Sequence, residues 1–534
     1  MSERVLNFLA DAEAYGERAR ARVRTVVRDY RETFLVTVCA GLAAYGFAML
    51  NVLNNQDNIS NTPGGYGAGI SSGRWFLEWL AETLRTLWGT NTLPLFNGLL
   101  SIVLVALAAC LTASVLELRA RPFRALTGAL FVTFPSLAMT MLFMFTVGYY
   151  SFALLLAVVG VYWAKNVRGL YGILPASVCM TLSLGIYQAY LPVAAALFLL
   201  ILLRYGCAER PPSALRLCLE GVRFLSVLVL GALFYMVVLR LSLSHSGQVL
   251  NEYQQIDQMG SISVSELPDM IAATYQNFFN LPFHAKYAVN DTPVIRFGFL
   301  CSLLLSAVLF LWLEVRGRAE RGVKLLNALY FTLFPAGAFS IVIMCYHSSI
   351  FGRMVYGAVT AFFLPFVLLE CVRERGGVAV RVLRKGAAAA LSVLLLLTSA
   401  NYVWQSNENY MVLYYTNRQT ENYFASMATR IRTLPGYRQD LYLAFVGENI
   451  TDRTFTNSVY RGSAHRYGGY TEASNYRKAG LSYMTHYLGF HQPTASAEDV
   501  LTLADMETVR AMPCYPDDGS IRIIDGYIVV KLED

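Results

Sequence analysis

Long apolar runs separated by short polar segments dominate the sequence. Each run has about 17 to 25 residues, the length that a helix needs to cross the hydrocarbon core of a membrane. Only 15% of the 534 residues are charged, against about a quarter in soluble domains. The pattern predicts a polytopic α-helical membrane protein with eleven spans. The expected spans are 33–53, 93–117, 124–142, 147–164, 169–186, 188–204, 217–241, 295–315, 324–345, 354–372 and 387–405.

Proline predicts irregular structure in two pairs of these spans. Pro135 lies in the pair 124–164, and Pro175 and Pro192 lie in the pair 169–204. Proline lacks a backbone donor and breaks or bends a helix. Each pair is therefore expected to contain a broken or re-entrant helix.

Basic residues predict the orientation. With the N-terminus inside, the inner segments contain 25 Lys and Arg and the outer loops contain 6. Loops on the cytoplasmic side carry such an excess. The N-terminus is therefore expected in the cytoplasm, and an odd number of spans places residue 406 onward outside. The net charge of +7 comes from these loops and does not indicate nucleic acid binding.

Three regions follow from this topology. Residues 1–31 contain seven arginines and are expected to form a basic amphipathic segment on the inner leaflet, or a solvated arm. Residues 32–405 form the transmembrane domain, with long outer loops at 55–92 and 242–294. Residues 406–534 are polar and rich in tyrosine.

The C-terminal region reads as a small extracytoplasmic α/β domain. Residues 417–434 have a helical pattern, and 441–447 read as a buried strand. Residues 521–532 predict a hairpin that turns at Asp525 and Gly526, because Asp-Gly favours a tight turn.

One acid follows the first span. Asp57 lies in a loop rich in Asn and Gly, and no other acid lies within about fifteen residues of the end of that span. It is either an ordinary loop acid among turn-forming residues or a general base that removes a proton from an acceptor hydroxyl. Ionisable residues at a membrane edge favour the second interpretation without proving it.

Outer arginines predict an anion site. Arg74 and Arg353 lie at outer ends of spans, where basic residues are few. They either extend toward lipid headgroups or clamp a lipid phosphate, for which the guanidinium fork is suited. Arg74 also precedes an amphipathic segment in which Trp75 and Glu78 begin two i, i+4 pairs, typical of a helix lying in the interface.

Three further polar residues are candidate substrate contacts. Tyr187 and Gln188 stand together at the outer end of two spans, and the Gln188 amide is suited to bind a sugar hydroxyl. His347 is a candidate base or phosphate partner, although a lone histidine is more often structural. The outer loops contain no Asp-x-Asp pattern and no His/Cys cluster, so we expect no bound metal.

Four short motifs carry a resemblance to a known family. They are Asn55-Gln56-Asp57, Ser72-Gly73-Arg74-Trp75, Leu184-Gly185-Ile186-Tyr187-Gln188-Ala189-Tyr190 and Leu443-Ala444-Phe445-Val446-Gly447. In order and spacing they resemble the GtrII-like glucosyltransferases, polytopic bacterial enzymes of the GT-C type that decorate surface polysaccharide. The resemblance covers roughly residues 30–534.

The resemblance implies a GT-C-like fold in the bacterial plasma membrane and a defined chemistry. The donor would be a polyprenyl-phosphate sugar, expected to be undecaprenyl-phosphate glucose, and the acceptor a glycan outside the membrane. Transfer would be inverting, without a cofactor, and Asp57 would be the base. Many GT-C enzymes have two neighbouring acids here. This chain has one, which leaves Glu78 or Glu82 as candidate helpers.

Two other functions remain open from the sequence. A flippase or transporter of lipid-linked saccharides would carry charged residues deep in its spans, whereas the span centres here are nearly free of charge. A polysaccharide polymerase would share the membrane and the lipid-linked substrate. The external domain favours a decorating transferase over a polymerase, and it does so only by analogy with the family.

Overall fold

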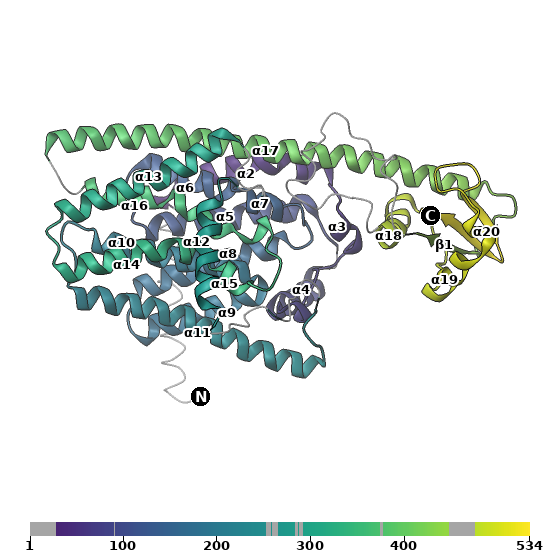
Figure 1. Ribbon diagram of the computed structural model, residues 1–534, viewed down its shortest axis with the longest axis horizontal. Helices are drawn as coiled ribbons and strands as arrows, with labels where there is room; N and C mark the ends of the chain where they lie inside the picture. Colours follow the sequence, from purple (N-terminus) through teal and green to yellow (C-terminus); the bar gives the residue numbers. More distant parts are fainter. Residues whose placement is uncertain are drawn as a thin grey trace.

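The computed structural model describes residues 28–533, apart from 90, 253–257, 259–264, 284–286, 288–291, 374–376 and 448–475. It consists of a large helical bundle and a small α/β domain beyond one end of the bundle (Figure 1). The predicted basic segment 1–31 lies almost entirely outside the described residues.

Twelve helices of the described chain form the body of the bundle. They are α2 (Arg31–Asn51), α5 (Pro94–Val115), α6 (Arg121–Thr133), α7 (Pro135–Thr140), α8 (Val147–Asn166), α9 (Leu170–Ile186), α10 (Leu191–Gly206), α11 (Ala214–Ser246), α13 (Pro293–Arg316), α14 (Arg321–Ala338), α16 (Leu364–Arg373) and α17 (Val378–Arg432). Shorter elements connect them. These are α3 (Gln56–Ser60), η1 (Ile70–Ser72), α4 (Trp75–Trp88), η2 (Gln188–Tyr190), α12 (Leu267–Asn280), α15 (Ile341–Met344), η5 (Gly352–Met354) and η6 (Tyr356–Phe362).

Nine helical segments of the described chain are long and apolar enough to cross a membrane. A polytopic helical membrane protein is therefore confirmed, while the count of eleven stays a prediction. The predicted span 169–186 is the shorter apolar helix α9, and the predicted span 324–345 is divided between α14 and α15.

Proline acts differently at its three predicted sites. The predicted break occurs before Pro135, because α6 ends at Thr133 and α7 begins at Pro135. Pro175 lies inside α9 without ending it, and Pro192 occupies the first turn of α10. The first turn tolerates proline because its N–H groups have no partner within the helix.

Small residues allow the helices to approach closely. A Cβ atom added to Gly128 of α6 would lie 2.7 Å from the backbone oxygen of Thr33 in α2. Close backbone approach is what holds helices together in lipid, where burial of apolar surface does not drive their association. Gly128 is therefore needed for the α2–α6 contact.

The C-terminal domain contains a three-stranded sheet of order β1-β3-β2. β1 (Tyr442–Val446) pairs parallel with β3 (Tyr527–Lys531), and β2 (Ile521–Ile524) pairs antiparallel with β3. The predicted strand and hairpin are thus present. Helices α18 (Tyr476–Leu488), α19 (Ala497–Asp505) and α20 (Glu507–Arg510) complete the domain.

One helix joins the two parts of the molecule. α17 has 55 residues without a break, running along the bundle and on to the α/β domain (Figure 1). The sequence pattern predicted two helices, 387–405 and 417–434, with the domain boundary at 405. The boundary falls inside α17, because no proline interrupts residues 378–432.

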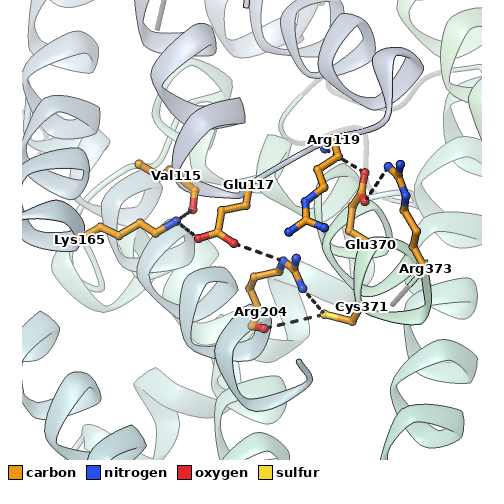
Figure 2. Close-up of polar contacts among 8 residues, drawn as sticks. All are labelled: Val115, Glu117, Arg119, Lys165, Arg204, Glu370, Cys371 and Arg373. Carbon is orange, nitrogen blue, oxygen red and sulfur yellow. Dashed lines mark hydrogen bonds and ion pairs between the residues drawn. The ribbon is translucent and has the colours of Figure 1, made fainter. Parts of the chain in front are cut away.

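Charged side chains link the ends of several helices near the end of α16 (Figure 2). The α16 end leads into α17 on the side of the bundle far from the C-terminal domain (Figure 1). Lys165 Nζ donates to the Val115 carbonyl at 2.6 Å and to Glu117 Oε1 at 2.8 Å. Arg204 Nε lies 3.9 Å from Glu117 Oε2. Arg204 is only 4% exposed, so this carboxylate offsets a buried charge.

Glu370 forms the second half of the same network. Its side chain is 1% exposed, and Oε1 accepts from the backbone N–H groups of Arg119 at 3.0 Å and Ala120 at 2.7 Å. Oε2 pairs with Arg373 at 3.5 Å. Arg204 also donates to the Cys371 sulfur at 3.4 Å, which links the two halves. We call these residues the ion network.

Candidate functional site

A short turn carries Asp57. Residues 56–60 form the single-turn helix α3, whose N-cap is the Asn55 side chain, which accepts from the Asn58 N–H at 2.7 Å. The Asp57 side chain is exposed, while Asn55 and Asn58 are buried. Within the described chain, no hydrogen bond or ion pair engages the Asp57 carboxylate, so it is available to a substrate.

The segment between α7 and α8 holds this turn. The Leu142 carbonyl accepts from Asn55 Nδ2 at 3.1 Å and from Asn58 Nδ2 at 2.8 Å. The next residue, Phe143, lies under Arg353, whose guanidinium carbon is 5.0 Å from the ring centroid. Two consecutive residues thus join the Asp57 turn to Arg353, although 57 and 353 are far apart in the sequence.

Arg353 lies in η5, which is anchored on α7. The Ser136 hydroxyl donates to the Gly352 carbonyl at 2.5 Å. Gly352 is packed tightly, because an added Cβ would lie 2.4 Å from the Tyr287 carbonyl. The guanidinium of Arg353 lies between the rings of Phe143 and Phe351, at 5.0 and 4.8 Å from their centroids.

Arg74 lies near Tyr187, a residue that also contacts Arg353. Its guanidinium lies 5.6 Å from the Tyr150 ring centroid and 5.7 Å from that of Tyr187. These two rings stack at 4.3 Å. Tyr187 also donates to the Arg353 carbonyl at 3.4 Å, and both guanidinium charges act on its hydroxyl. Tyr187 therefore contacts both arginines, the Arg74 side chain through its ring face and the Arg353 backbone through its hydroxyl.

Neither arginine has a carboxylate partner within the described chain. The guanidinium groups of Arg74 and Arg353 lie over aromatic rings, and Arg74 Nε is buried without a hydrogen-bond acceptor among the described residues. Arg74 also directly precedes α4, whose N-terminus is the positive end of the helix dipole. Among the described residues, both guanidinium charges are thus left without an anionic partner.

Gln188 fixes the turn before Arg74. Its Nε2 donates to the Gly73 carbonyl at 3.1 Å and to the Tyr235 hydroxyl at 3.0 Å, and Tyr235 donates to the same carbonyl at 3.0 Å. Gly73 has φ +74°, a backbone conformation that residues with a side chain rarely adopt. The geometry favours a positioning role for Gln188, and its predicted contact with sugar stays a prediction.

Glu78 and Trp75 lie on the next stretch. Glu78 Oε2 accepts from the Ile70 N–H at 2.8 Å and so closes the turn before α4. Trp75 packs on Gly185, and its buried indole N–H has no acceptor among the described residues. Both residues line a groove of about 720 Å³ between α4 and the end of α11. Its other lining residues are Ile70, Phe76, Trp79, Glu82, Thr83, Thr86, Leu182, Ser242, His245 and Ser246.

His347 is separate from these contacts. Its Nε2 lies 3.3 Å from Glu266 Oε2, at the start of α12. This carboxylate is an ion-pair partner for the imidazole when the imidazole is protonated. Its role as a base or phosphate partner stays a prediction. Within the described residues no group of three or more His, Cys, Asp and Glu side chains is placed to hold a metal.

Sequence reasoning missed the residues that assemble the site. Tyr150, Phe143 and Tyr235 provide the faces and hydrogen bonds that place Arg74 and Arg353. Each lies in an apolar run rich in aromatic residues, so composition alone does not distinguish it from a packing residue. The Leu142 carbonyl is backbone and has no sequence signal.

Residues 46–365 match the family model for the glucosyl transferase GtrII. The chain belongs to the GtrII glucosyltransferase family. The match includes every candidate site residue from Asp57 to Arg353, whereas the C-terminal α/β domain lies outside it. No match was found among curated proteins or among solved structures.

Membership in the GtrII family confirms the resemblance drawn from the motifs. It makes the chain a membrane glycosyltransferase, with a sugar donor and an acceptor as substrates. Within the part of the chain that the structure describes, the site offers one carboxylate and two guanidinium groups without an ion-pair partner.

Proposed function

We propose that this protein transfers a sugar, glucose by family, from a polyprenyl-phosphate donor to a glycan on the outer side of the bacterial plasma membrane. The reaction inverts the anomeric centre and uses no metal or other cofactor. Asp57 is the general base, and Arg74 and Arg353 bind the donor phosphate. The donor's polyprenyl tail lies in the surrounding lipid.

One observation carries the proposal: two arginines without carboxylate partners in the described chain both contact Tyr187, Arg74 through its guanidinium and Arg353 through its backbone. Removing a cation from water costs several kcal/mol unless an anion offsets it. A phosphate diester provides that anion and accepts the parallel hydrogen bonds of a guanidinium fork. When the bond between the anomeric carbon and the phosphate oxygen breaks, its electron pair stays on that oxygen, so the phosphate gains a second negative charge, which the same arginines stabilise.

Asp57 completes the reaction. The acceptor hydroxyl loses its proton to the Asp57 carboxylate as its oxygen bonds to the anomeric carbon, and the bond from that carbon to the phosphate oxygen breaks. The leaving phosphate needs no proton, so one carboxylate is sufficient. The contact chain from Asn58 through Leu142 and Phe143 to Arg353 supports placing base and phosphate site together.

The groove beside Trp75 is a candidate site for the acceptor glycan. Its lining combines indole rings with carboxylates, hydroxyls and an imidazole. Such groups bind the apolar faces and the hydroxyls of a sugar. Concave sites of several hundred Å³ are the usual size for such ligands.

The test is an assay with the purified full chain in proteoliposomes. Polyprenyl-phosphate hexoses with a radiolabelled sugar are offered together with surface polysaccharide from the host bacterium. We expect label in the polysaccharide, fastest with glucose, and unchanged in the presence of EDTA. Movement of the intact lipid-linked sugar between leaflets without transfer would identify a flippase instead.

Orientation is tested separately. A cysteine introduced at Glu498, on the first turn of α19, is expected to react with an impermeant maleimide in intact spheroplasts. The variant Cys514→Ser serves as background, since Cys514 is the only other cysteine in that domain. Labelling only after lysis would place the domain in the cytoplasm and contradict the proposed side of the reaction.

A further inference from the structure

The C-terminal part of the chain binds the backbone of the Asp57 turn. Asn417 of α17 accepts from the Asn54 N–H at 2.7 Å through Oδ1 and donates from Nδ2 to the Asn54 carbonyl at 2.8 Å. One side-chain amide thus satisfies both backbone groups of Asn54. The contact joins residues separated by 363 positions.

Two further contacts come from the α/β domain itself. The Tyr487 hydroxyl of α18 donates to Asn54 Oδ1 at 3.0 Å and lies 3.4 Å from the Thr62 hydroxyl. Ile59 is 2% exposed and belongs to the apolar core of that domain, together with Phe424 and Met484. The domain therefore holds the turn on both sides of Asp57.

The bundle holds the same turn through different atoms. Asn55 and Asn58 donate to the Leu142 carbonyl, as described above. Consecutive residues, Asn58 and Ile59, are thus bound by different bodies, the bundle and the α/β domain. The position of the exposed Asp57 carboxylate therefore depends on how the bundle and the α/β domain are placed relative to each other.

We propose that the C-terminal domain positions the base, with Asn417 and Tyr487 as positioning residues for Asp57. The proposal rests on the assignment of Asp57 under the proposed function. A base acts only within hydrogen-bond reach of the hydroxyl that it deprotonates. A displacement of about 1 Å at a reacting group can cost about 100-fold in rate. The domain is therefore part of the catalytic machinery rather than an appended module.

The variants remove these contacts with little change elsewhere. Asn417→Ala deletes both bonds to Asn54, and Tyr487→Phe deletes only the hydroxyl. Asn407→Ala is the matched control on α17, because Asn407 Nδ2 donates at 2.9 Å to Ala43 of α2 rather than to the turn. Tyr437→Phe is the matched control in the α/β domain, where Tyr437 donates to Gln492 at 3.1 Å.

The rate of transfer from polyprenyl-phosphate glucose is measured for each purified full-length variant. We expect kcat to fall about 10- to 100-fold in Asn417→Ala and about 3- to 10-fold in Tyr487→Phe. The donor KM should stay within about two-fold, because Arg74 and Arg353 are untouched. Both controls should retain the wild-type rate.

The same variants in an Asp57→Asn background separate positioning from general loss of structure. If Asn417 and Tyr487 act through Asp57, their substitutions should not lower the residual rate any further once the base has been removed. An equal fold-loss in both backgrounds would overturn the proposal. Wild-type rates for Asn417→Ala and Tyr487→Phe, with a lowered rate for Asp57→Asn, would also overturn it. In that case Asp57 would remain the base, but the C-terminal domain would not position it. A nearly wild-type Asp57→Asn would instead overturn both assignments.

Discussion

The candidate site and the ion network both contain buried or half-buried cations, but among the described residues only the cations of the ion network have carboxylate partners. In the ion network Lys165 pairs with Glu117, and Arg373 pairs with Glu370 (Figure 2). In the site, Arg74 and Arg353 contact aromatic faces and have no carboxylate within the described chain. The first arrangement is complete without a ligand, and the second is not.

The difference separates structural charge from functional charge. A buried cation that already has an anion gains little from a second one. A cation over aromatic rings keeps its N–H donors available while the ring faces stabilise its charge. Changes in the site should therefore affect catalysis, whereas changes in the ion network should affect stability.

The largest expected effect is on the rate, from Asp57→Asn. The amide keeps the shape of the side chain and removes the base, so transfer should fall about 10²- to 10⁴-fold. The melting temperature and donor binding should stay near wild type, since an exposed acid contributes little to stability. A rate within a few-fold of wild type at saturating acceptor would exclude Asp57 as the base and direct attention to Glu78, Glu82 and His347.

Glu370→Ala should produce the reverse result. It leaves the part-buried backbone N–H groups of Arg119 and Ala120 without this acceptor. The loss of a partner for such a donor costs about 1–3 kcal/mol, whereas the pair with Arg373 contributes little because Arg373 is 44% exposed. We expect a clearly lower melting temperature in detergent and an unchanged kcat in the folded fraction at low temperature. A stable variant with lost activity would contradict the division between the two regions.

Arg74→Lys and Arg353→Lys test the phosphate clamp. Lysine keeps the charge but loses the planar fork, so the donor KM should rise about 10-fold in each. Arg85→Lys is the control, because Arg85 pairs with Glu82 at 3.0 Å on the exposed side of α4. Wild-type kinetics at low donor concentration in both site variants would make these arginines headgroup anchors.

The smallest effect is the pH dependence contributed by Glu117. Burial raises the pKa of its carboxyl, but the charges of Lys165 and Arg204 outweigh burial and lower the pKa from its ordinary 4.5. Such a group adds stability above pH 4.5 and loses that contribution as the pH falls through its lowered pKa. Glu117→Gln should therefore reduce the melting temperature at pH 7, and the difference should disappear as the pH falls below the lowered pKa of Glu117. The shift should be modest, because the side chain is 42% exposed.

Much of the fold is predictable from local sequence. Run length and hydropathy placed the membrane helices, Pro135 marked the break between α6 and α7, and Asp525-Gly526 marked the hairpin. Each of these features depends on neighbouring residues, so one sequence contains enough information. The continuity of α17 was missed because the change from apolar to polar composition resembled a domain boundary.

Assembly of the site depends on long-range contacts that leave no local pattern. Arg74 and Arg353 were proposed separately as clamp residues, but nothing in the sequence predicts that both contact Tyr187. The pairing of Asn54 with Asn417 has no signal either, since asparagine is common in turns and at helix surfaces. Gln188 was expected to bind a sugar hydroxyl and Glu78 to assist the base, which stay predictions, and the structure shows both side chains bonded to the chain's own backbone.

Because α17 is unbroken, the number of residues in it sets both the distance and the relative rotation between the bundle and the α/β domain. Each helical residue turns the chain by about 100° and advances it by about 1.5 Å. One residue inserted after Tyr402 would rotate Asn417 away from Asn54, whereas seven residues would restore its direction to within about 20° and shift the domain by about 10 Å. Length changes in this part of α17 are therefore constrained by rotation before they are constrained by distance.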